Sequence, residues 1–154
     1  STLNAVKWNY WLSVSVYDYE DGIVYWNRKD DSLSVTKRYY AMGQFSKFIE
    51  PGSERIGIEY GDSLGWNGIE SVAFIKPDGR LALIIINDSP RNHKISLHGG
   101  YGNVTEIVTD EQRDWAVRDF AFDGYIDVPA NCVATYIFTG ENPFAGDNQG
   151  LLHK

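Results

Sequence analysis

The chain has 154 residues, of which 43% are hydrophobic, 23% are charged and 14% are aromatic, and its formal net charge is −7. This is the length of one ordinary domain and the composition of a folded globular protein, so the chain is not expected to be disordered. The negative charge and the lack of a Lys or Arg run in the sequence argue against binding to nucleic acid or to an anionic membrane.

The first predicted element is a strand in LNAVKWNYWLSVSV, residues 3–16. Apolar or aromatic residues occupy every second position from Trp8 to Val16, which is the period of a strand. Trp11 makes the opposite face apolar as well, and a strand that is apolar on both faces is typical of a parallel sheet or a barrel. A loop follows, with a short extended segment at residues 23–26.

Residues 37–50 predict an amphipathic helix, with Thr36 as its N-cap and Pro51 with Gly52 as its end. Gly43 inside the helix costs about 1 kcal/mol relative to alanine, which indicates close packing against a neighbour at this position. An apolar stripe recurs at three- and four-residue spacing. It consists of Tyr39, Met42, Phe45 and Ile49, widened by Ala41 and Phe48.

Residues 53–139 contain short strands separated by turn signals, which indicates an antiparallel β-sandwich. KPDG, residues 76–79, supplies the turn of the clearest hairpin. The glycine-rich HGGYGN, residues 98–103, lacks the residues of a phosphate-binding loop and is better explained as a hairpin turn. Cys132, the single cysteine, excludes an internal disulfide and lies in an apolar strand, which favours a buried, unreactive thiol. The strands are expected at residues 55–60, 68–75, 80–88, 93–97, 103–109, 125–129 and 132–138.

A doubly apolar strand and a helix with a broad apolar stripe need more cover than one small sandwich offers. The predicted fold class is therefore mainly β, an antiparallel β-sandwich preceded by the last βα unit of a TIM-type (β/α)8 barrel. Residues 1–52 would be the strand, loop and helix of the barrel, and residues 53–139 the side β-sandwich. Residues 140–154 would form a C-terminal surface tail.

The sequence contains no pattern for a metal or a cofactor. His93, His98 and His153 are scattered, and no second cysteine accompanies them. Glu20 and Asp21 lie in the loop after the first strand, where a barrel places active-site residues, but we prefer the simpler explanation that they are solvated loop residues. No catalytic residue, metal ligand or cofactor is therefore predicted in this chain.

Aromatic residues are the candidates for a binding site. Trp8, Tyr10 and Trp11 crowd one strand, and Tyr17 lies just beyond its end. At the mouth of a barrel such rings could stack on a sugar, so these four are the predicted substrate-binding residues. The alternative is that they fill the interface between the barrel strand and the helix.

Three stretches together resemble the C-terminal part of glycoside hydrolase family 30: KRYYAMGQFSKFIEPGSERIG, ESVAFIKPDGRLALIIINDS and IDVPANCVATYIF, at residues 37–57, 70–89 and 126–138. NAVKWNYW, residues 4–11, is similar to the eighth barrel strand of that family, whose tryptophans help to form the sugar site. The resemblance spans residues 3–139 and implies a TIM-type barrel fused to a side β-sandwich that also contains a strand from the N-terminal region.

The resemblance also implies where the chemistry lies. Members hydrolyse β-linked glycans with retention, through a covalent glycosyl-enzyme that needs two glutamates, one after the fourth and one after the seventh barrel strand. Both glutamates would precede Ser1, so this chain alone is not expected to be catalytically competent. Its implied partners are a β-linked oligo- or polysaccharide and the N-terminal barrel portion of the same enzyme, with a separate chain as one possibility.

The resemblance narrows the substrate class. Glucuronoxylan-specific relatives carry an arginine just after the strand-eight tryptophans, whereas LSVSVYDYEDG, residues 12–22, has no Arg and an acidic cluster. This favours a neutral glycan such as β-1,6-galactan, β-1,6-glucan or xylan. We expect a secreted or extracellular protein, although the sequence shows neither a signal peptide nor an apolar run long enough to cross a membrane. Sequons at Asn87 and Asn103 leave N-glycosylation open.

Two other hypotheses remain open. The first is a stand-alone carbohydrate-binding β-sandwich without catalysis, in which Trp66 and Trp115, both near turns, form the aromatic platform. The second is a domain that only braces the barrel.

Overall fold

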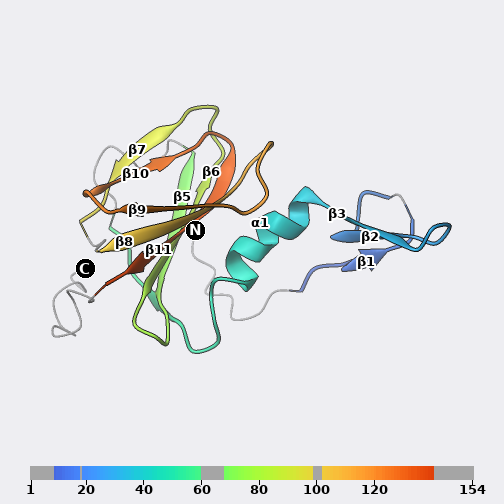
Figure 1. Cartoon of the computed structure of the whole chain (residues 1–154), viewed down its shortest axis with the longest axis horizontal. Helices are drawn as coiled ribbons and strands as arrows, with labels where there is room; N and C mark the ends of the chain where they lie inside the picture. Colours follow the sequence, from blue (N-terminus) through green and yellow to red (C-terminus); the bar gives the residue numbers. More distant parts are fainter. Residues whose placement is uncertain (1–8, 18, 60–67, 99–101, 141–154) are drawn as a thin grey trace. The chain divides into compact units, whose positions relative to one another are not determined.

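A computed structural model of the chain describes residues 9–17, 19–59, 68–98 and 102–140. The chain divides into two units, Ser1–Tyr39 and Tyr40–Lys154. Helix α1 (Lys37–Ser46) begins in the first unit and continues into the second (Figure 1). Within the described ranges, no helix has the length and apolar character needed to cross a membrane.

The first unit contains a three-stranded sheet in the order β1-β2-β3. Strand β1 (Val14–Ser15) runs parallel to β2 (Val24–Asn27), and β2 is antiparallel to β3 (Ser32–Val35). The extended segment expected at residues 23–26 is therefore confirmed, whereas β3 was not predicted.

The long strand predicted through residue 16 is wrong for its described part, because only Val14–Ser15 is paired as a strand. A strand exists only where neighbours supply its ladder hydrogen bonds, and among the described residues β1 is bonded to β2 alone. Trp11, which was expected to lie on a buried strand, is 82% exposed. Residues 1–8 lie outside the described residues.

Helix α1 begins directly after Thr36, as predicted, but ends at Ser46 rather than at residue 50. Helical hydrogen bonds continue briefly beyond that end, since the Lys47 N–H donates to the Gly43 carbonyl at 3.0 Å. The hydroxyl of Thr36 donates to the Ile23 carbonyl at 2.7 Å, which ties the start of the helix to the loop before β2.

The buried face of α1 is not the predicted apolar stripe. Gly43 and Gln44 are the buried residues of the helix, whereas Met42 and Phe45 are only half-buried. The surface against which this face packs explains the difference. The sandwich presents hydroxyl groups and an indole ring there, and a glycine and a glutamine fit these groups better than aliphatic side chains do.

The second unit is a β-sandwich with unequal layers (Figure 1). Six antiparallel strands form the larger sheet in the order β4-β5-β6-β11-β8-β9, and β10 pairs with β7 in the smaller one. The predicted antiparallel sheets are thus confirmed, and β9 is the one strand of this unit that the sequence did not predict. The strands are β4 (Glu54–Ile56), β5 (Ile69–Ile75), β6 (Leu81–Asn87), β7 (His93–Ser96), β8 (Asn103–Thr109), β9 (Ala116–Ala121), β10 (Tyr125–Val128) and β11 (Cys132–Thr139).

The core lies between the two layers. Ile95 of β7 and Ile126 of β10 belong to the same buried cluster as Leu83, Tyr136 and Phe138 of the larger sheet. In the smaller sheet these residues alternate with more exposed ones, as the period of two predicts, whereas β6 and β11 of the larger sheet are buried along nearly their whole length.

Two connections test the predicted turns. KPDG is the predicted hairpin turn: the Lys76 N–H donates to the Arg80 carbonyl at 2.8 Å, and Gly79 has a φ of +82°. The prediction of a hairpin turn in HGGYGN is wrong, because β7 and β8 belong to different sheets and are not paired with each other. Residues 99–101 of this segment lie outside the described residues.

The two sequons differ in access. Asn87 is 1% exposed, and its side-chain nitrogen donates to the carbonyls of Arg91 and Pro129 at 2.8 and 2.7 Å. Both amide hydrogens are used in the core, so this nitrogen is not available for a glycan in the folded chain. Asn103 is exposed at the start of β8.

Cys132 is buried, as predicted, and its thiol donates to the Pro129 carbonyl at 3.1 Å. Burial is the main cause that raises the pKa of this thiol to about 11. As the pH rises above the ordinary thiol pKa of 9.0, the unfolded chain loses this proton while the folded chain keeps it. The free energy of unfolding should therefore fall between about pH 9 and about pH 11, by on the order of 1 kcal/mol per pH unit.

Urea unfolding at about pH 8 and about pH 10 would measure this slope. The Cys132→Ala variant should show a shallower fall over the same interval, although it will be less stable at both pH values because it leaves a cavity. An equal slope in the two proteins would contradict the assignment to Cys132.

Candidate functional site

The predicted sugar-binding residues lie in the first unit. Trp11 is 82% exposed, Tyr17 is 59% exposed and Tyr10 is half-buried. Trp8 lies outside the described residues. The structure therefore presents two of the four predicted rings to solvent, which is what stacking on a sugar face requires.

A local turn sets the position of Tyr17. Ser15 is 1% exposed, and its hydroxyl donates to the Tyr17 carbonyl at 2.9 Å and accepts from the Tyr17 N–H at 3.3 Å. The ring of Tyr17 stacks on that of Tyr19, with centroids 5.4 Å apart and planes 23° from parallel. The two rings make an exposed aromatic pair.

Arg38 contacts Tyr10 and the loop between β1 and β2. Its guanidinium lies over the ring of Tyr10, with Cζ 5.4 Å from the centroid. One Nη group also donates to the carbonyls of Glu20 and Gly22 at 3.0 and 3.2 Å. One face of Tyr10 is thus covered by the guanidinium, which leaves Trp11 and Tyr17 as the better-placed rings for a sugar.

The two loop carboxylates have different surroundings. Glu20 is exposed and adopts a φ of +56°. Asp21 is half-buried, and its Oδ1 is enclosed without a hydrogen-bond partner among the described residues. In the part of the chain that the structure describes, no cluster of three or more His, Cys, Asp or Glu side chains could hold a metal ion.

Trp66 and Trp115 form the aromatic platform of the alternative hypothesis, and of these two the structure describes Trp115. It gives this residue another role. Its indole N–H donates to the Tyr40 carbonyl at 2.8 Å, and its ring meets Tyr40 edge-on with centroids 5.2 Å apart. Lys47 Nζ lies 4.7 Å from the same ring. The indole is therefore part of the packing of α1 against the sandwich, not a platform for sugar. Trp66 lies outside the described residues.

Comparison with known proteins gives one family match. Residues 52–136 match the model described as "Glycosyl hydrolase family 30 beta sandwich domain". The lysosomal acid glucosylceramidase of Mus musculus is 30% identical over 67 residues, which make up 44% of this chain and 12% of the mouse protein.

Solved structures agree with this match. A GH30 endoxylanase from Clostridium papyrosolvens is 25% identical, with a TM-score of 0.58 over 69% of this chain and 28% of that chain. The endo-β1,6-glucanase BT3312 is 26% identical, with a TM-score of 0.52 over 78% of this chain and 22% of that one. A GH30 xylanase C from Talaromyces cellulolyticus shares the fold at 24% identity, with a TM-score of 0.66 over 78% of this chain and 28% of that chain. The chain thus spans less than a third of each of these solved chains.

Proposed function

Because the chain belongs to glycoside hydrolase family 30 through its β-sandwich domain, we propose that it is the C-terminal portion of a retaining β-glycosidase that acts on a neutral β-linked glycan. The family match over residues 52–136 is the observation that carries this proposal. The enzyme is proposed to be secreted or extracellular and to degrade a polysaccharide outside the cell.

The catalytic glutamates are proposed to lie on polypeptide outside this chain, on the N-terminal barrel portion of the enzyme. The first unit would then supply the last barrel strand and the loop after it, and α1 the last barrel helix. The burial of Gly43 and Gln44 against the sandwich supports this division, because it leaves the apolar stripe of Met42 and Phe45 only half-covered. A barrel would cover that stripe.

The segment that would lie at the mouth of the barrel bears on the substrate. Residues 12–22 contain no basic side chain of their own to pair with a uronic acid, and their acidic residues would repel one. The Arg38 guanidinium contacts this segment, but it is already bonded to the Glu20 and Gly22 carbonyls. The likeness to an endoxylanase and to an endo-β1,6-glucanase supports xylan or β-1,6-glucan, and β-1,6-galactan is a further candidate. Trp11 and Tyr17 would stack on the neutral sugar rings.

The test is to add the purified chain to aryl β-glycosides, xylan and β-1,6-glucan, alone and together with the barrel portion of the same enzyme. No turnover is expected from the chain alone, because a retaining glycosidase needs both carboxylates. Hydrolysis with retention is expected when the barrel portion is present. Turnover by the pure chain, without any other polypeptide, would refute the placement of the catalytic pair.

The same assay tests the aromatic residues in the reconstituted enzyme. The Tyr17→Ala change should lower kcat/KM by about tenfold or more, because an aromatic binding anchor is lost. Trp26→Ala is the matched control: this ring lies on β2, and its indole N–H is already bonded to Asp31 at 2.7 Å. Equal activity of the two variants would remove Tyr17 from the site.

A further inference from the structure

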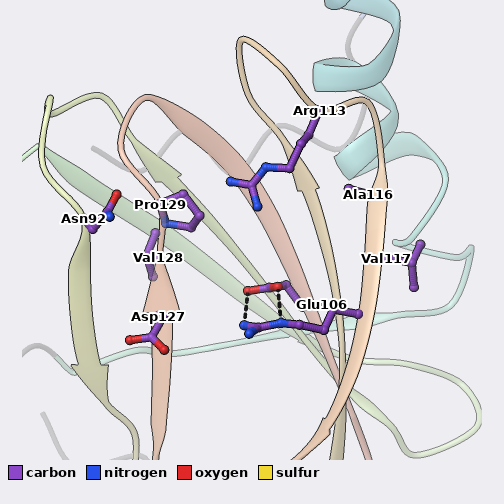
Figure 2. A pocket seen from close by; sticks show the side chains of 9 residues that line it. Asn92, Glu106, Arg113, Ala116, Val117, Asp127, Val128 and Pro129 are labelled. Carbon is purple, nitrogen blue, oxygen red and sulfur yellow. Dashed lines mark hydrogen bonds and ion pairs between the residues drawn. The ribbon is translucent and has the colours of Figure 1, made fainter.

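The second unit has a cleft of about 480 Å³ that is remote in sequence from Trp11 and Tyr17. One wall is formed by residues 116–118 of the edge strand β9, together with Glu106 of β8. The other wall is formed by residues 127–129, at the end of β10 in the smaller sheet, with Asn92 beside them (Figure 2). Its volume lies within the range of roughly 300–1,000 Å³ that is usual for small-molecule sites.

An ion pair between a buried glutamate and an exposed arginine orients the first wall. Glu106 is 4% exposed and lies directly opposite Arg118 in the β8–β9 register. Arg118 Nε and Nη2 donate to the two carboxylate oxygens at 2.9 and 3.2 Å. The guanidinium also lies over the ring of Phe120, at 4.8 Å from its centroid. Arg118 is therefore held in one orientation, and the pair leaves its Nη1 hydrogens unused.

The second wall offers an acceptor and a donor. Asp127 has an exposed side chain. Its backbone is held in place, since the backbone carbonyl of Asp127 accepts from the Tyr136 hydroxyl at 2.9 Å. The Asn92 amide oxygen accepts from the Ala130 N–H at 2.8 Å. This bond fixes the amide orientation and leaves the Asn92 nitrogen as a donor. Pro129 adds apolar surface beside them, whereas Val128 is completely buried behind the cleft.

The charges of the lining favour a neutral ligand. Glu106 and Arg118 neutralise each other, and Arg113 is paired with Asp110. Asp127 adds one negative charge, which disfavours an anion. A sugar hydroxyl both donates and accepts hydrogen bonds. The donors at Arg118 and Asn92 could bond to its oxygen, and the carboxylate of Asp127 could accept its hydrogen.

An extended peptide added to the edge of β9 is a less suitable occupant. The strand is short, and its middle carries the charged residues Arg118 and Asp119. Charged side chains on short edge strands are the usual means of preventing further strand pairing.

We propose that this cleft is a second saccharide-binding site, formed by other residues than Trp11 and Tyr17. It would hold a neutral stretch of the glycan. The ligand class rests on the proposed function, whereas the location rests on the geometry of the cleft. Such a site would keep a polymeric substrate near the enzyme and would raise its effective concentration at the catalytic centre.

The test is a titration of the isotope-labelled chain with xylohexaose and with β-1,6-linked gluco-oligosaccharides, followed by backbone amide chemical shifts. Shift changes are expected at residues 116–118 and 127–128. The Asp127→Ala variant should bind about tenfold more weakly, because a charge-assisted hydrogen bond is lost. Arg118→Lys keeps a positive charge beside Glu106, so that the chain still folds. It removes the guanidinium donors, and it should therefore also weaken binding.

Glu70→Ala is the matched control, because it removes an exposed carboxylate from the same sheet at β5, four strands away from β9. This variant should bind like the parent chain. Unchanged affinity in Asp127→Ala, or shift changes confined to residues 10–19, would overturn the second site while leaving the proposed function intact. Shift changes at the cleft without any at residues 10–19 would support the second site and count against the proposed aromatic site.

Discussion

Replacing Gln44 by leucine should lower the free energy of unfolding of the second unit by about 2 kcal/mol, because two buried hydroxyl groups would each lose the shorter of their two hydrogen bonds and keep only one of 3.4 Å. Gln44 is completely buried. Its amide nitrogen donates to Thr109 Oγ1 at 2.9 Å, and its amide oxygen accepts from Thr135 Oγ1 at 2.7 Å. Leucine fills similar space but can make neither bond, so the packing gain does not offset the loss.

Urea unfolding followed by tryptophan fluorescence would measure this effect. Gln112→Leu is the matched control, since Gln112 lies exposed in the loop before β9 and should change stability by less than about 0.5 kcal/mol. Adding Thr135→Val to Gln44→Leu should recover part of the loss, because removing both partners of a hydrogen bond costs less than removing one. A Gln44→Leu variant as stable as the parent would show that these hydrogen bonds do not hold α1 to the sandwich.

The burial of Gln44 could not be predicted from the sequence. The apolar stripe of α1 predicts that it is the packing face, because hydrophobic periodicity is the main sequence signal for burial. Gln44 breaks that rule, and its burial depends on Thr109 and Thr135, which lie 65 and 91 residues further along the chain. No local pattern predicts a partner at such a distance.

Strands of the sandwich were predictable where apolar residues mark them, and β9 was missed because its residues are mostly exposed. Strands β6 and β11 are buried along nearly their whole length, so their apolar runs stood out in the sequence. Strand β9 is exposed at five of its six residues. It therefore carries no apolar alternation, and only its pairing with β8 makes it a strand.

Some residues of the candidate sites could be predicted from the sequence, and the contacts between them could not. Exposed aromatic residues such as Trp11 and Tyr17 could be proposed from their residue types and their place after a predicted strand. The covering of Tyr10 by Arg38 and the fixing of Arg118 by Glu106 could not, because they depend on contacts between separate elements. The role of Trp115 was missed for the same reason, although the glycine at position 43 had already indicated a close neighbour.

Replacing Gly43 by alanine should destabilise the second unit by about 1–3 kcal/mol, the usual cost of overpacking. A Cβ atom at this position would overlap Trp115 Cζ2 and would lie 3.0 Å from both Cε2 and Cη2. The ring cannot easily retreat, because its N–H is bonded to the Tyr40 carbonyl at 2.8 Å. The higher helix propensity of alanine returns only about 1 kcal/mol, so the net change should be unfavourable.

The matched control for this change is Gly57→Ala, because a Cβ there would meet no atom within 4 Å. That variant should be neutral or slightly more stable, since alanine restricts the unfolded chain. Thermal unfolding of both variants therefore separates the general effect of removing a glycine from the specific contact with Trp115. If Gly43→Ala were as stable as Gly57→Ala, the indole would not be fixed against α1. Trp115 could then move to meet a ligand, and the alternative of a sugar platform at this residue would return.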